Sequence, residues 1–158
     1  MKKLILLTFT LLCISLSVFA DTEQEALNFF NSYVENANNY SPKIAEMYSP
    51  SAKIIRQVVK PDGTTADAVT DTATYIKQMK LGQAGAKLRQ YKNNYSNISV
   101  TPLDNGAYKI SSLRQPSGEN YKLKTYMVVK KQADGKWLII EEMMQTKVQV
   151  FLKYADKK

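Results

Sequence analysis

The chain has 158 residues, with 22 Lys plus Arg against 14 Asp plus Glu, one Cys, ten Tyr and no His, and its formal net charge is +8. A length near ~150 residues usually makes one domain. An apolar fraction of 44% is enough to bury a core. The absence of histidine excludes Ser-His-Asp and Cys-His catalysis and zinc sites built on imidazole.

Residues 1–20 have the pattern of a secretory signal peptide. Lys2 and Lys3 precede an apolar stretch from Leu4 to Val18, and Ala20 ends the segment with an acceptable cleavage pattern. A retained transmembrane anchor is the alternative, but the apolar stretch is shorter than the ~20 residues that a bilayer requires. We therefore expect cleavage after Ala20 and a periplasmic or secreted protein, and the short Lys-Lys start is typical of bacteria.

Cleavage changes the composition of the remaining chain. Removing 20 residues from 158 leaves 138, with a net charge of +6 and without Cys13, the one cysteine. No disulfide, thiol nucleophile or thiolate metal site is then expected. No long linker interrupts the remaining chain, so we expect a single domain over residues 21–158.

The sequence pattern predicts helices in the first part of this domain. Thr22 and Glu25 have the spacing of a capping box. The apolar residues that follow recur every three to four positions, which is typical of one helix face. A Ser-Pro pair at residues 41–42 restarts a short helix, and the Ser-Pro pair at residues 49–50 ends it.

Strands and one further helix follow. Residues 52–60 are rich in Ile and Val and end at a Pro-Asp-Gly turn, and residues 66–70 can pair back as a second strand. A helix starts near residue 72 and loosens around Gly82 and Gly85. From about residue 88 the pattern changes to period two, and three turn signatures separate four long strands. These strands cover residues 89–101, 107–115, 120–131 and 136–150.

Strands joined by tight turns form an antiparallel meander, and one face of it can pack on the helices. The fold class is therefore α+β, with N-terminal helices on an antiparallel sheet. The residues predicted to face inward are Tyr108, Ile110, Ser112, Tyr121, Leu123, Thr125, Met127 and Val129. In the last strand Trp137 and Ile139 share one face and Leu138 and Ile140 the other, so the pattern does not decide which of these faces points inward.

The order of elements and two short stretches resemble the nuclear transport factor 2-like superfamily, which includes ketosteroid isomerase, scytalone dehydratase and the SnoaL-type polyketide cyclases. YSPSAKI (residues 48–54) is similar to the family's turn into its first strand, and DGKWLIIEE (residues 134–142) to its final turn and strand. The resemblance implies a cystatin-like α+β cone whose curved sheet leaves a pocket at the wide end, and a homodimer through the sheet.

The resemblance transfers the fold and the pocket, but no catalytic residue. Enzymes of the superfamily place Asp or His inside the cone, whereas Ser51 stands here where many members have an acidic residue. Glu141 and Glu142 are adjacent on a strand and point to opposite faces. Glu141 enters the pocket if Trp137 faces inward, and a desolvated carboxyl there could act as the base of an isomerase or dehydratase. A solvated or ion-paired strand end is the alternative.

The predicted pocket is mostly apolar with a few polar anchors. An inward phenol can donate a hydrogen bond to a carbonyl ligand, although tyrosine more often packs in the core. Arg114 can bind an anionic head group or form a salt bridge at the rim. The candidate ligand-binding residues are Tyr33, Tyr48, Tyr121, Met127 and Arg114.

Lysines are expected on the outer face of the sheet, where an acidic envelope protein or an anionic lipid surface could dock. They are Lys109, Lys122, Lys124 and Lys130. Secretion argues against nucleic acid as a partner, and the sequence has no glycine-rich phosphate loop or metal-ligand cluster, so no cofactor or metal is expected. The leading hypothesis is a non-catalytic binding protein for a small amphipathic ligand or an envelope partner.

Overall fold

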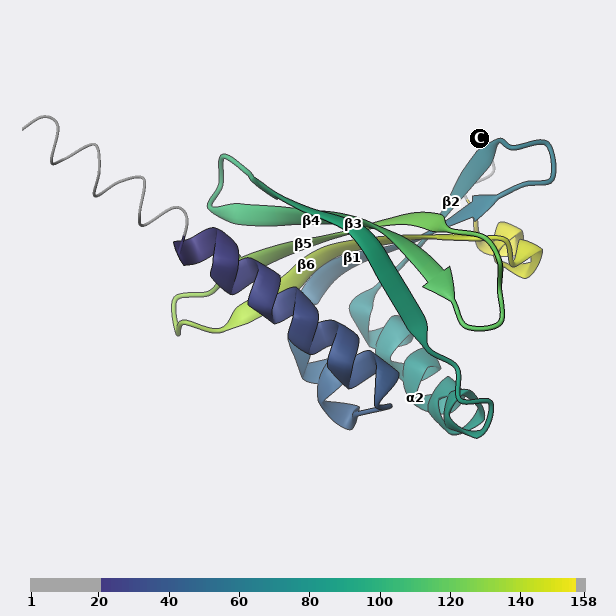
Figure 1. Ribbon diagram of the computed structural model, residues 1–158, viewed down its shortest axis with the longest axis horizontal. Helices are drawn as coiled ribbons and strands as arrows, with labels where there is room; N and C mark the ends of the chain where they lie inside the picture. Colours follow the sequence, from purple (N-terminus) through teal and green to yellow (C-terminus); the bar gives the residue numbers. More distant parts are fainter. Residues whose placement is uncertain (1–20, 156–158) are drawn as a thin grey trace, which may run out of the picture.

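The computed structural model describes residues 21–155 (Figure 1). The expected signal peptide, residues 1–20, lies outside the described residues, so its cleavage stays a prediction. No helix among the described residues is both long and apolar enough to cross a membrane.

The first described element is a helix over residues 21–38. Its inner face is buried through Ala26, Phe30 and Tyr33, as the three-to-four spacing predicts. The predicted capping box is wrong, because Thr22 is already helical and does not occupy a cap position.

Glu25 instead ties this helix to the sheet. Its Oε2 accepts hydrogen bonds from Lys131 Nζ at 2.7 Å and from Trp137 Nε1 at 3.1 Å. These two donors lower the pKa of the Glu25 carboxyl, so it stays ionised. The indole of Trp137 therefore points toward the helical side of the sheet, which settles the inner face at the start of the last strand.

The predicted Ser-Pro start of the second helix is confirmed. Ser41 is the N-cap of the 3-10 helix η1 (Pro42–Met47), its hydroxyl accepts from Lys43 N at 3.3 Å, and Pro42 occupies the first turn, where no amide hydrogen bond is lost. The strand after it begins earlier than expected, at Tyr48 rather than Ala52.

The remaining elements follow the predicted order, with shifted bounds. They are β1 (Tyr48–Val59), β2 (Thr65–Thr70), α2 (Thr72–Leu88), β3 (Asn93–Pro102), β4 (Ala107–Pro116), β5 (Leu123–Lys131), β6 (Trp137–Thr146) and the 3-10 helix η2 (Gln149–Tyr154). Helix α2 continues through Gly82 and Gly85, so the predicted strand over 89–101 starts only at Asn93. The last strand ends at Thr146, and η2 was not predicted.

The six strands form one sheet in the order β2-β1-β6-β5-β4-β3. The predicted antiparallel meander from β3 to β6 is confirmed. Strand β6 also pairs with β1 in parallel, which the period-two pattern did not predict, and this pairing places Ile54 beside Glu142 and Arg56 beside Met144. This pairing joins the two halves of the chain.

A β-bulge interrupts β6. Val128 pairs with Glu141 while the next residue, Val129, pairs with Ile139, so Ile140 is an extra residue on its strand. A bulge of this kind reverses the alternation of side chains between the two faces of the sheet. Ile139 before the bulge and Glu142 after it are therefore both buried on the inner side.

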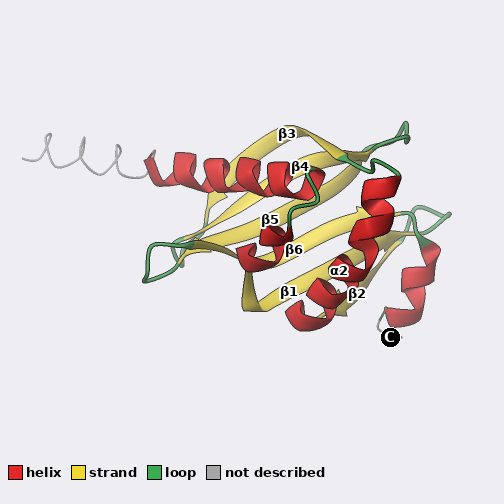
Figure 2. Ribbon diagram, turned by 90° about the horizontal axis from the view of Figure 1, so that it is seen from below, coloured by secondary structure: helices red, strands yellow, loops and turns green. Residues whose placement is uncertain are grey.

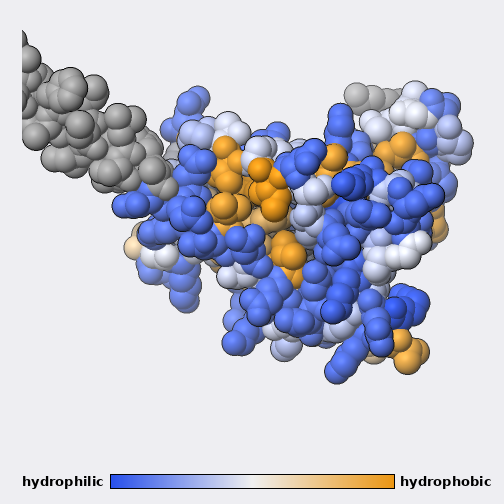
Figure 3. Space-filling view, in the orientation of Figure 1, coloured by the Kyte–Doolittle hydropathy of each residue, from blue (hydrophilic) through white to orange (hydrophobic). Residues whose placement is uncertain are grey.

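The helix over residues 21–38, η1 and α2 lie on one face of the sheet (Figure 2). The core between the layers includes Phe30, Ile54, Ile110, Val129 and Ile139. Burying each of these side chains contributes roughly 1.5–3 kcal/mol relative to leaving it exposed. On the outside, hydrophobic residues gather in a few areas between hydrophilic ones (Figure 3).

Most inward-facing predictions for β4 and β5 are confirmed. The side chains at these positions are buried, at Tyr108, Ile110, Ser112, Leu123, Thr125, Met127 and Val129. Tyr121 is the exception, because it precedes β5 and lies in the connection from β4, where strand alternation does not apply.

Candidate functional site

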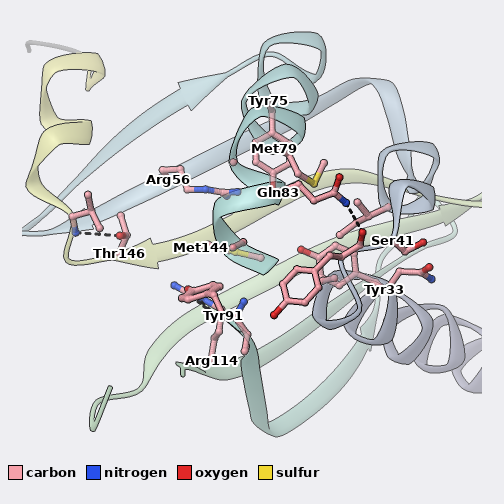
Figure 4. A pocket seen from close by; sticks show the side chains of 18 of the residues that line it. Tyr33, Ser41, Arg56, Tyr75, Met79, Gln83, Tyr91, Arg114, Met144 and Thr146 are labelled. Carbon is pink, nitrogen blue, oxygen red and sulfur yellow. Dashed lines mark hydrogen bonds between the residues drawn. The ribbon is translucent and has the colours of Figure 1, made fainter. Parts of the chain in front are cut away.

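A cavity of about 410 Å³ lies against the inner face of the sheet (Figure 4). Its walls come from the end of the first helix, from η1, α2 and η2, and from strands β1, β3, β4 and β6. The lining residues include Tyr33, Tyr40, Arg56, Gly82, Arg114 and Met144. Its volume falls in the range of ~300–1,000 Å³ that is usual for small-molecule sites.

A buried carboxylate lies behind one wall of this cavity. Glu142 is 0% exposed. Its Oε2 accepts from Tyr48 Oη at 2.5 Å and from Tyr33 Oη at 3.1 Å, and its Oε1 accepts from Arg56 Nη1 at 2.8 Å. These four residues, the Glu142 cluster, come from β6, β1 and the first helix, and the parallel β1–β6 pairing brings them together.

In this cluster both phenols stay protonated and Arg56 stays charged. Desolvation, and then the charge of Glu142, raise the pKa of Tyr33 and of Tyr48 well above the usual range, so both phenols remain donors at neutral pH. Burial lowers the pKa of Arg56, whereas the interactions with Tyr75 and Glu142 raise it. The second effect is larger, so the pKa of Arg56 lies above its usual value. The Arg56 guanidinium carbon lies 4.7 Å from the centre of the Tyr75 ring.

Arg114 is the second charged residue in the lining, and it is 7% exposed. Its Nη1 donates to Asn93 Oδ1 at 2.8 Å and to Tyr91 Oη at 3.3 Å, and its Nη2 donates to the Gln145 carbonyl at 2.8 Å. The alternative of a salt bridge at the rim is wrong. The Arg114 side chain is buried, and no carboxylate oxygen of residues 21–155 lies within 4.0 Å of its guanidinium nitrogens.

The other candidate ligand residues are spread over several places. Tyr33 lines the cavity, and Tyr48 lies behind it in the Glu142 cluster. Met127 does not line the cavity; it is buried in the core near Phe30. Tyr121 does not line it either, and the Lys147 ammonium lies 4.0 Å above the Tyr121 ring.

The prediction that Glu141 shares the inner face of Trp137 is wrong. Glu141 accepts a hydrogen bond from Tyr126 Oη at 2.6 Å on the outer face, and Glu142 is the inner carboxylate. The physical reason is the bulge at Ile140, which reverses the alternation that the prediction assumed.

Sequence reasoning missed Arg56, and a signal was present. Arg56 lies between Ile54 and Val58, both completely buried, so alternation alone assigns it to the inner face. Tyr91 and Asn93, the partners of Arg114, had no such signal because they lie where α2 gives way to β3.

The four lysines of the predicted partner surface have different surroundings. The Lys109 ammonium lies 4.0 Å above the outer Tyr126 ring, and Lys122 Nζ donates to Ser96 Oγ at 3.3 Å. Lys124 is exposed, and Lys130 is half-buried beside Leu138. Their role toward a partner stays a prediction. Within residues 21–155 no group of three or more His, Cys, Asp or Glu side chains could hold a metal ion.

The sequence matches no protein-family model, and no curated protein matches it. Solved structures do resemble the fold. A proposed scytalone dehydratase from Novosphingobium aromaticivorans has a TM-score of 0.60 at 16% identity, over 81% of this chain and 86% of that one. A proposed ketosteroid isomerase from Shewanella frigidimarina has a TM-score of 0.55 at 17% identity, over 75% and 93%.

A domain of unknown function with a cystatin-like fold from Nostoc punctiforme is also similar, with a TM-score of 0.55 at 14% identity over 84% of each chain. Together with the curved six-stranded sheet and the helices on one face, these similarities confirm the nuclear transport factor 2-like fold predicted from the sequence. At these identities the likeness concerns the fold alone.

Proposed function

We propose that this chain is a periplasmic or secreted, non-catalytic binding protein that holds a small amphipathic ligand in the cavity of Figure 4. The observation that carries the proposal is the composition of the cavity wall. Apolar side chains such as Ile44, Met79 and Met144 make up much of the lining, and buried polar groups such as Arg114 and Tyr33 interrupt it. Such a wall suits a ligand with an apolar body and one polar head.

The competing proposal is an isomerase or dehydratase, and it is supported by neighbours of the same fold that are described as such enzymes. The predicted base of this enzyme is Glu141, but Glu141 accepts a hydrogen bond from Tyr126 on the outer face. Glu142 is the inner carboxylate, yet three donors already occupy its two oxygens and it does not line the cavity. A general base must lie within hydrogen-bond reach of the substrate, and Glu142 lies outside the cavity lining, so this placement favours binding over catalysis.

A second proposal, docking of an acidic envelope protein or an anionic lipid surface, is supported by lysines that share the outer face. Lys124 is exposed there beside Tyr126 and Lys109. Reversing Lys109, Lys122, Lys124 and Lys130 to Glu should abolish sedimentation with anionic vesicles or capture of an acidic partner. Unchanged binding by the reversed protein would exclude this surface.

Gly82 offers a direct test of the ligand site. It is exposed and lines the cavity, so it lies at the mouth, and a Cβ built on it meets nothing within 4 Å. Gly82→Leu should therefore block the mouth while leaving the backbone undisturbed, and replacing a helical glycine adds up to ~1 kcal/mol of stability. Gly82→Ala is the matched control, because it gains the same backbone stability and leaves the cavity open.

The assay is thermal unfolding with decanol, decanoate and decylamine as probes, with decanol below its solubility limit and the two ionic probes below their micelle concentrations. A probe at a hundred times its Kd stabilises the folded protein by about 2.7 kcal/mol, which is a readily measured rise in Tm. We expect at least one probe to raise the Tm of the wild type and of Gly82→Ala, and to be recovered chemically unchanged. If no probe raises the Tm, or if Gly82→Leu responds like the wild type, the proposal fails.

A further inference from the structure

We infer that the cavity selects amphipathic acids, and that Arg114 binds the carboxylate head of the ligand; the inference rests on the proposed function and names the chemistry of its ligand. The charged side chains in the lining are those of Arg56 and Arg114, and both are cations. Figure 4 shows the two guanidinium groups on either side of Met144.

The two arginines differ in how their charge is compensated. Arg56 forms a 2.8 Å ion pair with Glu142, so that pair is neutral as a whole. The acceptors of Arg114 are an amide oxygen, a phenol and a backbone carbonyl, all of them neutral. A buried cation without a counter-ion is costly, because neutral dipoles replace only part of its hydration. An anionic ligand would supply the missing charge.

The guanidinium of Arg114 also has donors to spare. A guanidinium carries five N–H donors, and three of those of Arg114 are directed at Asn93, Tyr91 and Gln145. The two that remain are the Nε–H and one N–H of Nη2, on adjacent nitrogens. Nε is buried and has no partner among the described residues. Because Arg114 lines the cavity, the free N–H of Nη2 can donate to a carboxylate oxygen of a ligand there.

A second buried donor without a partner lies in the same lining. Three buried side-chain atoms in residues 21–155 have no hydrogen-bond partner, and two of them, Arg114 Nε and Tyr40 Oη, belong to lining residues. Tyr40 also has a φ of +55°, in the left-handed region that costs a non-glycine residue ~1 kcal/mol or more. Its carbonyl accepts from Gln83 Nε2 of α2 at 2.5 Å, which holds the strained residue at the cavity.

The rest of the lining fits the apolar body of such an acid. Ile44, Met79, Met144 and Phe151 come from four different elements and are apolar, and methionine adapts to ligands of varied shape. A straight-chain acid of about ten carbons, with its head on Arg114, is a suitable probe for a site of this size.

The test compares head groups on one tail by isothermal titration calorimetry at neutral pH, with decanoate, decanol and decylamine. We expect the wild type to bind decanoate at least tenfold more tightly than decanol, and decylamine most weakly. Arg114→Gln should lose the preference for decanoate and keep its affinity for decanol, whereas Arg114→Lys should recover part of the preference. Arg89→Gln, at an exposed arginine just after α2, is the matched control and should bind like the wild type.

The outcomes separate this inference from the proposed function. If decanol and decanoate bind the wild type equally, or if decylamine binds best, the selection of acids is refuted and the ligand site stands. If none of the three binds, both fail. If Arg114→Gln folds and prefers decanoate as strongly as the wild type does, the role of Arg114 is refuted. If Arg114→Gln does not fold, the comparison of head groups on the wild type alone decides whether the cavity selects acids.

Discussion

Replacing Glu142 by Gln should destabilise the protein strongly, although the side chain keeps its shape. The carboxylate accepts from Tyr33, Tyr48 and Arg56 through two oxygens. An amide has one oxygen and an NH2 group, so Gln would turn a donor toward either the phenols or the guanidinium. The charge of Arg56 would also lose its counter-ion.

The size of the effect follows from burial. Removing one partner of a buried ion pair costs about 3–5 kcal/mol. The Arg56 side chain is 16% exposed and retains some contact with water, so the lower end of that range applies here. At roughly 4 °C per kcal/mol for a domain of this size, a loss of 3 kcal/mol lowers the Tm by on the order of 12 °C.

Urea unfolding of four proteins isolates the interaction: wild type, Glu142→Gln, Arg56→Gln and the double variant. Because the double variant leaves no unpaired charge, it should lose less than the sum of the single losses, by on the order of 1–3 kcal/mol. Glu141→Gln is the control on the other face of the same strand, where the carboxylate meets Tyr126, and it should cost less than about 1 kcal/mol. Equal losses for Glu141→Gln and Glu142→Gln, or strictly additive single losses, would refute the reasoning.

Three further predictions concern the layers around the cavity. Desolvation raises the pKa of Tyr33 and Tyr48 above 10, so the folded state keeps both protons where the unfolded state loses them. The free energy of unfolding therefore does not change with pH through these two phenols below pH ~10, and above pH ~10 it falls by up to ~2.7 kcal/mol per pH unit. When both residues are replaced by Phe, the urea midpoint should fall less steeply above pH ~10. Thr72→Val keeps the shape of the side chain but removes the hydroxyl that donates to the Ala52 carbonyl at 2.9 Å, so it should cost ~1 kcal/mol in urea unfolding. Gln90→Gly should raise stability by roughly 0.5–1 kcal/mol in the same assay, because Gln90 follows α2 with a φ of +52°, and Gln90→Ala should not.

The sequence predicted the fold well wherever the signal was local. Period-two alternation and turn residues identified the meander from β3 to β6, and the three-to-four spacing identified the first helix. The parallel pairing of β1 with β6 could not be predicted in this way, because its partners Ile54 and Glu142 lie far apart in the chain and neither strand carries a local mark of the other.

The candidate site was predicted less well, because one extra residue reverses a face. Without the bulge at Ile140, Glu141 would share the inner face with Ile139 and the prediction for Glu141 would hold. A bulge of one ordinary residue has no signature in a single sequence, since no glycine marks this position. Arg114 was predicted as a pocket residue and lines the cavity, but its neutral partners Tyr91 and Asn93 could be found only in three dimensions.

The arrangement of charge couples the stability of the protein to its ligand. The inner face of the sheet carries two guanidinium groups, the partly exposed one of Arg56 and the buried one of Arg114, and Glu142 neutralises the one on Arg56. The other, on Arg114, raises the free energy of the folded state by the part of its lost hydration that Asn93, Tyr91 and Gln145 do not replace. A carboxylate ligand restores that part only in the folded protein, because the unfolded chain exposes Arg114 to water. The same uncompensated charge that destabilises the folded protein thus gives an acidic ligand its advantage over a neutral one of equal length.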